Sequence, residues 1–414
     1  MSITILHFSD AHIGVEQTGR RDNSTDLSLR LMDYLHSLDT IIDTAIQKKV
    51  DMVLFSGDAY HSRTPNPTLQ REWGRRIMRL SKAGIFTLLL VGNHDISPAF
   101  QRAHSLDSFI TFDVPYVMVI ERPTFLRPQQ LNDLPLQVIA LPWIHRSGLM
   151  ANLKIEAEGT SAFEILQQKV IELVMGWIDQ ADSSLPLVLT AHVTVQGAEV
   201  GGYGTITAQN EAVLPPSLLK DSRLDYVGLG HIHKAQNLNE GNHPPVVYAG
   251  SIERVNFGEA NEEKGFYLVH VEKGKTVLEW QPLKTRQYLT CEVEIRSPES
   301  IMELIWAKMP SKETIAGKIF RLILSYNRDW ETLIDEAALR KYAEDAFEFK
   351  IVRRPIIDVR SRLPEGIDIS HLSPLDLLKL YWEVNNKNKE TFQEIAQLAK
   401  EIFEEQEQLI TRGD

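Results

Sequence analysis

Five short apolar segments in the first two-thirds of the chain each lead into carboxylate, imidazole or amide side chains. The segments are residues 3–9, 51–56, 85–91, 185–190 and 224–229. Continuous apolar runs of this length, bounded by turn residues, are typical of β-strands that are buried on both faces. Helical apolar spacing occurs between them, at residues 27–49 and 70–83. This alternation of strands and helices predicts a layered α/β domain.

The polar residues that follow the five segments are chemically alike. They are Asp10 and His12; Asp58; Asn93, His94 and Asp95; His192; and His231 and His233. In α/β sheets, ligand sites lie beyond the carboxyl ends of the strands, so we expect these motifs to meet in one cleft. On a continuing strand, Asp10 and His12 would share a face, and so would His231 and His233.

Seven of these residues are candidate metal ligands: Asp10, His12, Asp58, Asn93, His192, His231 and His233. Carboxylate, imidazole and amide oxygen, without a thiolate, suit Mn²⁺, Fe²⁺, Zn²⁺ or Mg²⁺ rather than soft metals. One zinc ion takes about four ligands, so this set predicts two ions about 3.5–4 Å apart that share a carboxylate. Such a pair clamps the attacking and leaving oxygens of an in-line displacement, which makes a phosphate ester the best-suited substrate.

Each motif also has a purely structural interpretation when it is taken alone. A single histidine at a strand end is more often a satisfied structural residue, and Gly57-Asp58 by itself is a common turn. The sequence Gly92-Asn93-His94-Asp95 after an apolar run is moderately specific. The metal prediction depends on all five motifs occurring in this order, each directly after a predicted strand.

Composition narrows the class of protein further. The net charge of −12 argues against a protein that coats nucleic acid non-specifically, although bound cations would offset part of it. No apolar run approaches the about 20 residues of a membrane-spanning helix, and the first residues lack the basic region of a secretory signal. Cys291 is the only cysteine, which excludes an internal disulfide. We therefore expect a cytoplasmic protein with no membrane association.

The pattern changes near Lys284. From there, strand-like and helical segments alternate at residues 291–295, 297–308, 318–326, 330–347 and 349–356. This order predicts a small βαβαβ unit. Residues 364–366 carry the Pro and Gly of a linker, and Ser373-Pro374 and Thr391-x-x-Glu394 are typical helix starts. We expect domains at residues 1–285, 286–365 and 366–414.

Together, the five motifs resemble the calcineurin-like metallophosphoesterase superfamily over roughly residues 1–275. The resemblance implies a two-sheet β-sandwich flanked by helices. It implies one metal site made of Asp10, His12, Asp58 and His233. It implies a second made of Asp58, Asn93, His192 and His231, in which Asp58 bridges the ions. His94 matches the family's catalytic histidine, and Asp95 would orient it.

His61 lies three residues after the bridging aspartate. A histidine at this position resembles the DNA double-strand-break repair nucleases, a branch in which that histidine contacts the substrate backbone. Residues 248–254 and 264–267 also resemble bacterial members of this branch. The branch implies a Mn²⁺-dependent exonuclease on duplex DNA ends with single-strand endonuclease activity. It implies a DNA-capping function for the βαβαβ unit, and roles in double-strand-break or hairpin processing, recombination and replication. The alternative is a phosphodiesterase or phosphatase that acts on small molecules or proteins.

The C-terminal helices resemble the tail through which this branch binds an SMC-like ATPase, in a heterotetramer that contains a nuclease homodimer. The last of these helices has an apolar stripe, made of Phe392, Ile395, Ala396, Ala399, Ile402, Phe403, Leu409 and Ile410. Two interpretations remain open, packing of the stripe on its own chain or on the partner. A catalytically silent scaffold for the ATPase is disfavoured, because every candidate ligand is present.

Two groups of basic residues leave alternatives open. Arg71, Arg75 and Arg79 recur at i, i+4 on one predicted helix, and Arg353 and Arg354 lie near the end of the predicted βαβαβ unit. Either group could contact phosphates and so make DNA binding sensitive to salt. Either could equally be ordinary solvated surface.

Overall fold

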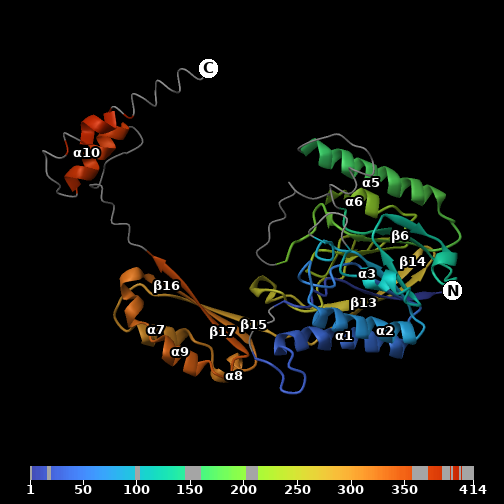
Figure 1. Ribbon diagram of the computed structural model, residues 1–414, viewed down its shortest axis with the longest axis horizontal. Helices are drawn as coiled ribbons and strands as arrows, with labels where there is room; N and C mark the ends of the chain where they lie inside the picture. Colours follow the sequence, from blue (N-terminus) through green and yellow to red (C-terminus); the bar gives the residue numbers. More distant parts are fainter. Residues whose placement is uncertain are drawn as a thin grey trace. The chain divides into compact units, whose positions relative to one another are not determined.

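The computed structural model describes residues 2–15, 20–97, 103–144, 160–201, 213–356, 372–384, 392, 395–400 and 402. These residues form a mixed α/β fold (Figure 1). They divide into two compact units. The first comprises Met1–Thr290 with the short segments Lys312–Phe320 and Asp345–Phe349, and the second contains the remainder.

Two six-stranded sheets form the centre of the first unit. In spatial order, the first sheet contains β14 (Lys275–Pro282), β13 (Gly265–Glu272), β1 (Ile3–Phe8), β2 (Met52–Phe55), β3 (Phe86–Leu90) and β4 (Val117–Ile120). The second contains β11 (Gln236–Asn237), β12 (Val246–Tyr248), β10 (Tyr226–Gly230), β7 (Leu187–His192), β6 (Gln137–Leu141) and β5 (Thr124–Leu126). Strands β1 to β4 run parallel, as do β6, β7, β10 and β12. The expectation of a two-sheet sandwich is confirmed.

Helices cover the outer faces of both sheets. Figure 1 shows α1 (Leu29–Lys48) and α2 (Pro67–Lys82) on one side and α5 (Thr160–Gln180) on the other. Alternate residues of one strand therefore enter different cores: Ile5 packs between the sheets, and Leu6 packs under α1 and α2. The strands must be apolar on both faces, which is why their sequences are nearly continuous apolar runs.

Shorter elements complete the first unit. They are α3 (Asp107–Thr111), the 3-10 helices η1 (Pro128–Gln130) and η2 (Phe257–Glu259), α6 (Pro216–Leu219), and the strand pair β8 (Thr194–Val195) and β9 (Val213–Leu214).

The arginines of α2 make ion pairs with carboxylates of both helices. The guanidinium groups of Arg76 and Arg79 lie 2.7 and 2.9 Å from the carboxylate of Asp39 on α1. Arg71 and Arg75 pair with Glu72 of their own helix. These contacts support a structural role for the charges. Helix α2 also begins earlier than predicted, at Pro67, because Asn66 caps it and proline is well suited to its first turn.

The second unit is built around the sheet β15 (Tyr288–Glu294), β16 (Ile319–Asn327) and β17 (Glu348–Ile356). Its helices are α7 (Ile301–Lys308), η3 (Arg328–Leu333), α9 (Glu336–Tyr342) and α10 (Pro374–Val384). Helix α8 (Lys312–Ile315), which follows α7 in the chain, belongs to the first unit. Strands and helices alternate in the predicted order, although 3-10 and α-helical turns replace the single predicted helix at 330–347. Helix α10 begins at Pro374 as predicted. Residues 364–366, Thr391, Glu394, Phe403, Leu409 and Ile410 lie outside the described residues.

Among the described residues, every helix is too short or too polar to span a bilayer.

A buried polar chain links the two sheets inside the sandwich. His7 of β1 contacts the Tyr226 hydroxyl through Nδ1 at 2.7 Å and the Ser56 hydroxyl through Nε2 at 2.9 Å. The Ser56 hydroxyl in turn lies 3.0 Å from the Thr190 hydroxyl. Complete burial lowers the pKa of His7 to about 3.

We expect acid to destabilise the fold through His7. Its folded pKa of about 3 lies below the 6.5 of an exposed histidine, so the unfolded chain takes up a proton first. The stabilisation is complete above pH 6.5 and is lost as the pH falls toward 3. Between about pH 7 and pH 4.5, the free energy of unfolding should drop by roughly 2 kcal/mol from this group alone. Urea unfolding in EDTA, followed from pH 7 to pH 4.5 for the wild type and for His7→Gln, measures this contribution as the difference between the two pH dependences. The same change in the free energy of unfolding in both proteins would contradict the prediction.

Candidate metal centre

All seven predicted ligands lie together beyond the carboxyl ends of β1, β2, β3, β7 and β10. Two overlapping groups of these residues have ligand atoms within 4.8 Å of one another: Asp10, His12 and His233, and Asp10, Asp58 and His192. A third group that meets the same criterion, His12, His61 and His94, shares only His12 with the seven. Asn93 contacts His192 of the second group, and His231 contacts Asn93 and donates its backbone N–H to Asp10. The prediction that the five motifs converge is therefore confirmed, and their role as metal ligands remains a prediction.

The first half of the cluster is formed around His12. Its Nε2 atom lies 3.0 Å from Nε2 of His233. The same atom lies 3.6 Å from Oδ2 of Asp58 and 3.9 Å from Oδ1 of Asp10. Two imidazole nitrogens and two carboxylates thus point into one small space.

The second half is formed around Asn93. Its Oδ1 atom lies 2.9 Å from Nε2 of His192 and 3.0 Å from Nδ1 of His231. Oδ2 of Asp58 lies 3.4 Å from His192 Nε2 and also faces His12, so one carboxylate oxygen borders both halves. This is the position that a bridging ligand requires.

Asp10 and His12 do not lie on a continuing strand. Strand β1 ends at Phe8, and Asp10, His12 and His231 have φ angles of 50°, 42° and 97°, in the left-handed region. The expectation that strand periodicity places each pair on one face is therefore wrong. The loops pair with each other instead, because Asp10 N–H donates to the carbonyl of Gly57 at 2.9 Å and His12 N–H donates to that of Asp58 at 3.1 Å. Strained backbone of this kind is common at functional sites.

Two glycines let the loops approach this closely. A Cβ atom at Gly92 would lie 2.2 Å from Oδ1 of Asp58, and one at Gly57 would lie 2.3 Å from Nδ1 of His192. Gly57 also has a φ of 101°, which side chains disfavour. Both motif glycines are therefore required by the packing of the ligands themselves.

The polar contacts of His192 fit a bound cation. Its Nδ1 lies 2.7 Å from the carbonyl of Ser56, which can only accept, so Nδ1 carries the proton. In the neutral ring, Nε2 then presents a lone pair to two oxygen atoms, from Asn93 and Asp58. Burial acts to lower the pKa of His192, but Asp58 outweighs it and raises the pKa to about 9. The site thus attracts positive charge, and this oxygen and nitrogen set fits divalent ions.

The same charges act on Asp58. Burial alone would raise the pKa of its carboxyl group, but His192 and His12 outweigh burial and hold that pKa far below its usual range. Asp58 is therefore a carboxylate at neutral pH, as a ligand must be.

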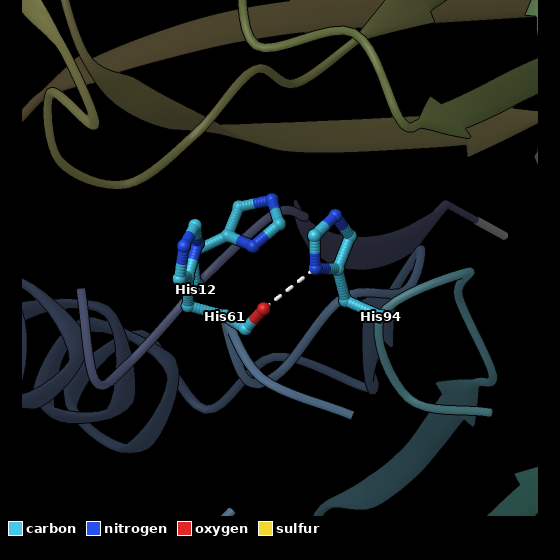
Figure 2. Close-up of side chains that lie close together, drawn as sticks. All are labelled: His12, His61 and His94. Carbon is cyan, nitrogen blue, oxygen red and sulfur yellow. Dashed lines mark hydrogen bonds between the residues drawn. The ribbon is translucent and has the colours of Figure 1, made fainter. Parts of the chain in front are cut away.

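His61 and His94 lie beside the cluster, with His12 as their neighbour (Figure 2). The His94 ring centroid is 4.9 Å from that of His12, and the His61 and His94 rings stack at 5.7 Å. Nδ1 of His94 lies 2.6 Å from the carbonyl of His61, and the His94 backbone N–H donates to Asp58 Oδ1 at 2.8 Å. His61 is exposed, so this edge of the cluster is open to solvent.

Asp95 does not orient His94, contrary to the expectation. The turn from Gly92 to Asp95 folds the carboxylate into the interior, where it accepts from the N–H groups of Asp58 at 2.9 Å, Ala59 at 3.1 Å and Gly92 at 3.0 Å. Asp95 therefore fixes the backbone that carries Asp58, and the His61 carbonyl holds the His94 ring.

Two residues next to the cluster carried no role in the sequence interpretation. Glu259 accepts from His233 Nδ1 at 2.9 Å and is buried. Trp143 packs against the rings of His231 and His192, with centroids 5.0 and 6.1 Å away. Trp143 follows the short apolar strand β6, which is a weak signal. Glu259 is a single acidic residue in a polar loop, and no local pattern marks it.

Comparisons with known proteins give one family match and several similar chains. A family model for calcineurin-like phosphoesterases matches residues 3–235. The SbcD chain of the nuclease SbcCD from Escherichia coli K12 is 24% identical over 289 residues, which cover 66% of each chain. The DNA double-strand break repair protein Mre11 of Archaeoglobus fulgidus is 24% identical over 359 residues, 83% of this chain and 73% of that one. A dimetal phosphatase from Danio rerio superposes with a TM-score of 0.43 at 11% identity, covering 68% of this chain and 96% of its own.

The match to the bacterial nuclease chain thus spans a little under two-thirds of that relative's length. The family model covers more than half of the 414 residues and contains all seven predicted ligands. The chain belongs to the calcineurin-like phosphoesterase family.

Proposed function

We propose that this protein is a metal-dependent DNA nuclease, an exonuclease on duplex ends with single-strand endonuclease activity. The observation that carries the proposal is the position of Asp58, whose Oδ2 lies within 3.6 Å of His12 Nε2 and within 3.4 Å of His192 Nε2. One carboxylate oxygen between two ligand groups is the arrangement of a two-metal phosphodiester hydrolase. The names of the two relatives, a nuclease subunit and a DNA double-strand break repair protein, support DNA as the substrate over other phosphoesters.

The two ligand groups would hold two divalent ions. One group is Asp10, His12, Asp58 and His233; the other is Asp58, Asn93, His192 and His231. Mn²⁺ is the favoured metal, with Mg²⁺, Fe²⁺ and Zn²⁺ as alternatives. When bound, the ions would supply an activated water and neutralise the charge that develops on the phosphate.

The remaining roles belong to the two open histidines. Nδ1 of His94 donates its hydrogen to the His61 carbonyl. Nε2 would therefore stabilise the transition state or protonate the leaving oxygen from the imidazolium form, in which it also carries a proton. The exposed ring of His61 would contact the DNA backbone and position the strand.

We assign the other parts of the chain by position. Residues 286–365 would form a DNA-capping domain, and residues 366–414 would bind an SMC-like ATPase of the SbcC type. The phosphoesterase domain, residues 1–285, would dimerise within a heterotetramer. The single cysteine, Cys291, agrees with a reducing, cytoplasmic location.

Digestion assays test the proposed function most directly. Purified protein with Mn²⁺ should degrade linear duplex DNA faster than it hydrolyses bis-p-nitrophenyl phosphate or a phosphoprotein, and EDTA should stop it. Hydrolysis of the small ester or the phosphoprotein without any cleavage of DNA would favour the alternative, a phosphodiesterase or phosphatase.

A chain shortened to residues 1–363 should fold, bind Mn²⁺ and cut short DNA, but it should no longer copurify with the ATPase. None of the seven ligands lies in the removed segment. In its described part, Leu377, Tyr381, Leu398 and Ile402 are 38–59% exposed. Covering each large apolar side chain is worth about 1.5–3 kcal/mol, which favours a partner at this surface.

A matched pair of variants in the full chain controls for the truncation. Leu398→Asp, at a side chain 59% exposed, should weaken copurification of the ATPase. Leu333→Asp, at a side chain 50% exposed in η3, should not. An insoluble or metal-free shortened chain would show that the segment packs on its own chain instead.

A further inference from the structure

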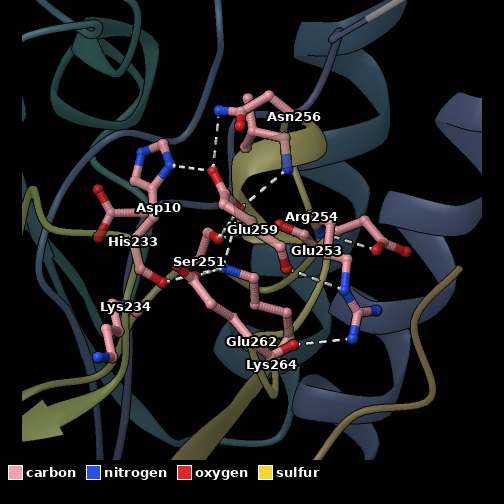
Figure 3. Close-up of polar contacts among 12 residues, drawn as sticks. Asp10, His233, Lys234, Ser251, Glu253, Arg254, Asn256, Glu259, Glu262 and Lys264 are labelled. Carbon is pink, nitrogen blue, oxygen red and sulfur yellow. Dashed lines mark hydrogen bonds and ion pairs between the residues drawn. The ribbon is translucent and has the colours of Figure 1, made fainter. Parts of the chain in front are cut away.

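We propose that Glu259 is a positioning residue that sets the tautomer and ring orientation of His233, and that Lys264 anchors both. The inference rests on the metal centre proposed above, and it adds two residues that no ligand motif contains. Figure 3 shows these side chains in one connected cluster.

The contact between His233 and Glu259 determines which ring nitrogen carries the proton. Nδ1 of His233 lies 2.9 Å from Oε1 of Glu259. A carboxylate only accepts, so Nδ1 must donate its hydrogen, and Nε2 is left with a lone pair. That Nε2 lies 3.0 Å from Nε2 of His12, in the space where the first group of ligand atoms converges. Only this tautomer presents a ligand atom there.

Lys264 holds both ends of this arrangement. Its side chain is fully buried, and Nζ lies 2.8 Å from Oε2 of Glu259 and 2.8 Å from Oε2 of Glu262. Nζ also donates to the backbone carbonyl of His233 at 3.0 Å. One ammonium group therefore fixes the main chain of the proposed ligand together with the carboxylate that holds its ring (Figure 3).

The loop that carries Glu259 is itself clamped. Asn256 caps the turn η2 by accepting from Gly258 N–H at 2.7 Å. The guanidinium of Arg254 donates to the carbonyls of Glu259 at 3.2 Å and Glu262 at 2.8 Å. Because both the loop and the side chain are held, the carboxylate has little freedom to leave His233. Rigid support of this kind tunes the affinity of histidine ligands.

A purely structural interpretation must be separated from this one. Glu259 could merely neutralise the buried charge of Lys264, since an unpaired buried charge is strongly destabilising. Glu253 provides a matched control. It is also 1% exposed, it pairs with Arg30 at 3.4 Å, and its carboxylate contacts Arg254 N–H. It lies in the same segment, but none of the contacts described for it involves His233.

Calorimetric titration with Mn²⁺ tests the proposal on the full-length protein. Wild type should bind two ions. Glu259→Gln should bind one of them about 10–100-fold more weakly and the other unchanged. Glu253→Gln should retain both affinities even if it unfolds at a lower temperature. The double variant Glu259→Gln/Lys264→Met removes both buried charges together, so it should fold and still show the weakened site.

The possible outcomes separate the two proposals. Two full-affinity sites in Glu259→Gln, or equal loss in Glu259→Gln and Glu253→Gln, would overturn the role of Glu259 and leave the nuclease proposal intact. Wild type that binds no Mn²⁺ would overturn the proposed metal centre, and the positioning role with it. Selective weakening of one ion in both Glu259 variants supports the assignment, because general destabilisation would not distinguish the two ions.

Discussion

Asp58→Asn should reduce Mn²⁺-dependent DNA cleavage by at least roughly 10³-fold, which corresponds to about 4 kcal/mol of lost transition-state stabilisation. Oδ2 of Asp58 borders both ligand groups, at 3.6 Å from His12 and 3.4 Å from His192. The amide removes the negative charge that both ions would share. Its oxygen can still accept the His94 backbone N–H, which Oδ1 of Asp58 accepts at 2.8 Å. We therefore expect the fold to change little.

The control for Asp58→Asn is Asp225→Asn. Asp225 is also buried, and it accepts from Leu187 N–H at 2.7 Å and Gly274 N–H at 2.6 Å. It precedes β10, whereas His231 follows β10, so the two residues lie at opposite ends of that strand. Asp225→Asn should lower the free energy of unfolding and leave DNA cleavage intact. Full nuclease activity in Asp58→Asn, measured on linear duplex DNA, would contradict the two-metal assignment.

The convergence of the ligands could be predicted because it follows from strand ends. Asp58, Asn93 and His192 each come at or just after a buried strand, and parallel strands bring their carboxyl ends to one edge. The same rule located His231 after β10. The layered α/β arrangement was accessible in the same way, because continuous apolar runs alternate with helical spacing. The division into two sheets followed only from the resemblance to the calcineurin-like superfamily.

The conformation inside the loops could not be predicted. Asp10 and His12 have φ angles in the left-handed region. The spacing of apolar residues carries no information about the φ angle of a loop residue, so this conformation could not be predicted. The carboxylate of Asp95 turns away from the adjacent His94 toward the backbone of Asp58, 37 residues earlier. Glu259 reaches His233 across 26 residues of sequence. Such contacts depend on how loops cross in space, and periodicity along one element contains no information about that.

The ion pairs between α1 and α2 also could not be predicted from the sequence. The arginine pattern of α2 correctly indicates a helix with one charged edge, but the sequence alone favours neither phosphate contact nor a solvated surface for these arginines. Arg76 and Arg79 share the partner Asp39, which lies 37 and 40 residues earlier on α1. Only the packing of α1 against α2 brings these charges together.

His94→Ala should keep both Mn²⁺ sites and lose about 10²–10⁴-fold in the rate of DNA cleavage, the usual range for removal of a general acid or base. His94 lies beside His12, one of the seven predicted ligands, and the prediction assigns it to the substrate rather than to an ion. Its ring centroid is 4.9 Å from that of His12, and its Nδ1 is engaged by the His61 carbonyl at 2.6 Å. The backbone N–H that supports Asp58 survives the substitution.

Two measurements on His94→Ala separate catalysis from binding. Calorimetry with Mn²⁺ should give two sites of wild-type affinity, and single-turnover cleavage at saturating DNA should show the loss in rate rather than in KM. His270→Ala is the control, since His270 is a partly exposed histidine of β13 that contacts Thr4. It should change neither quantity. If His94→Ala loses both ions, then His94 is itself a ligand, because a side chain that acts only on the substrate has no reason to alter metal affinity.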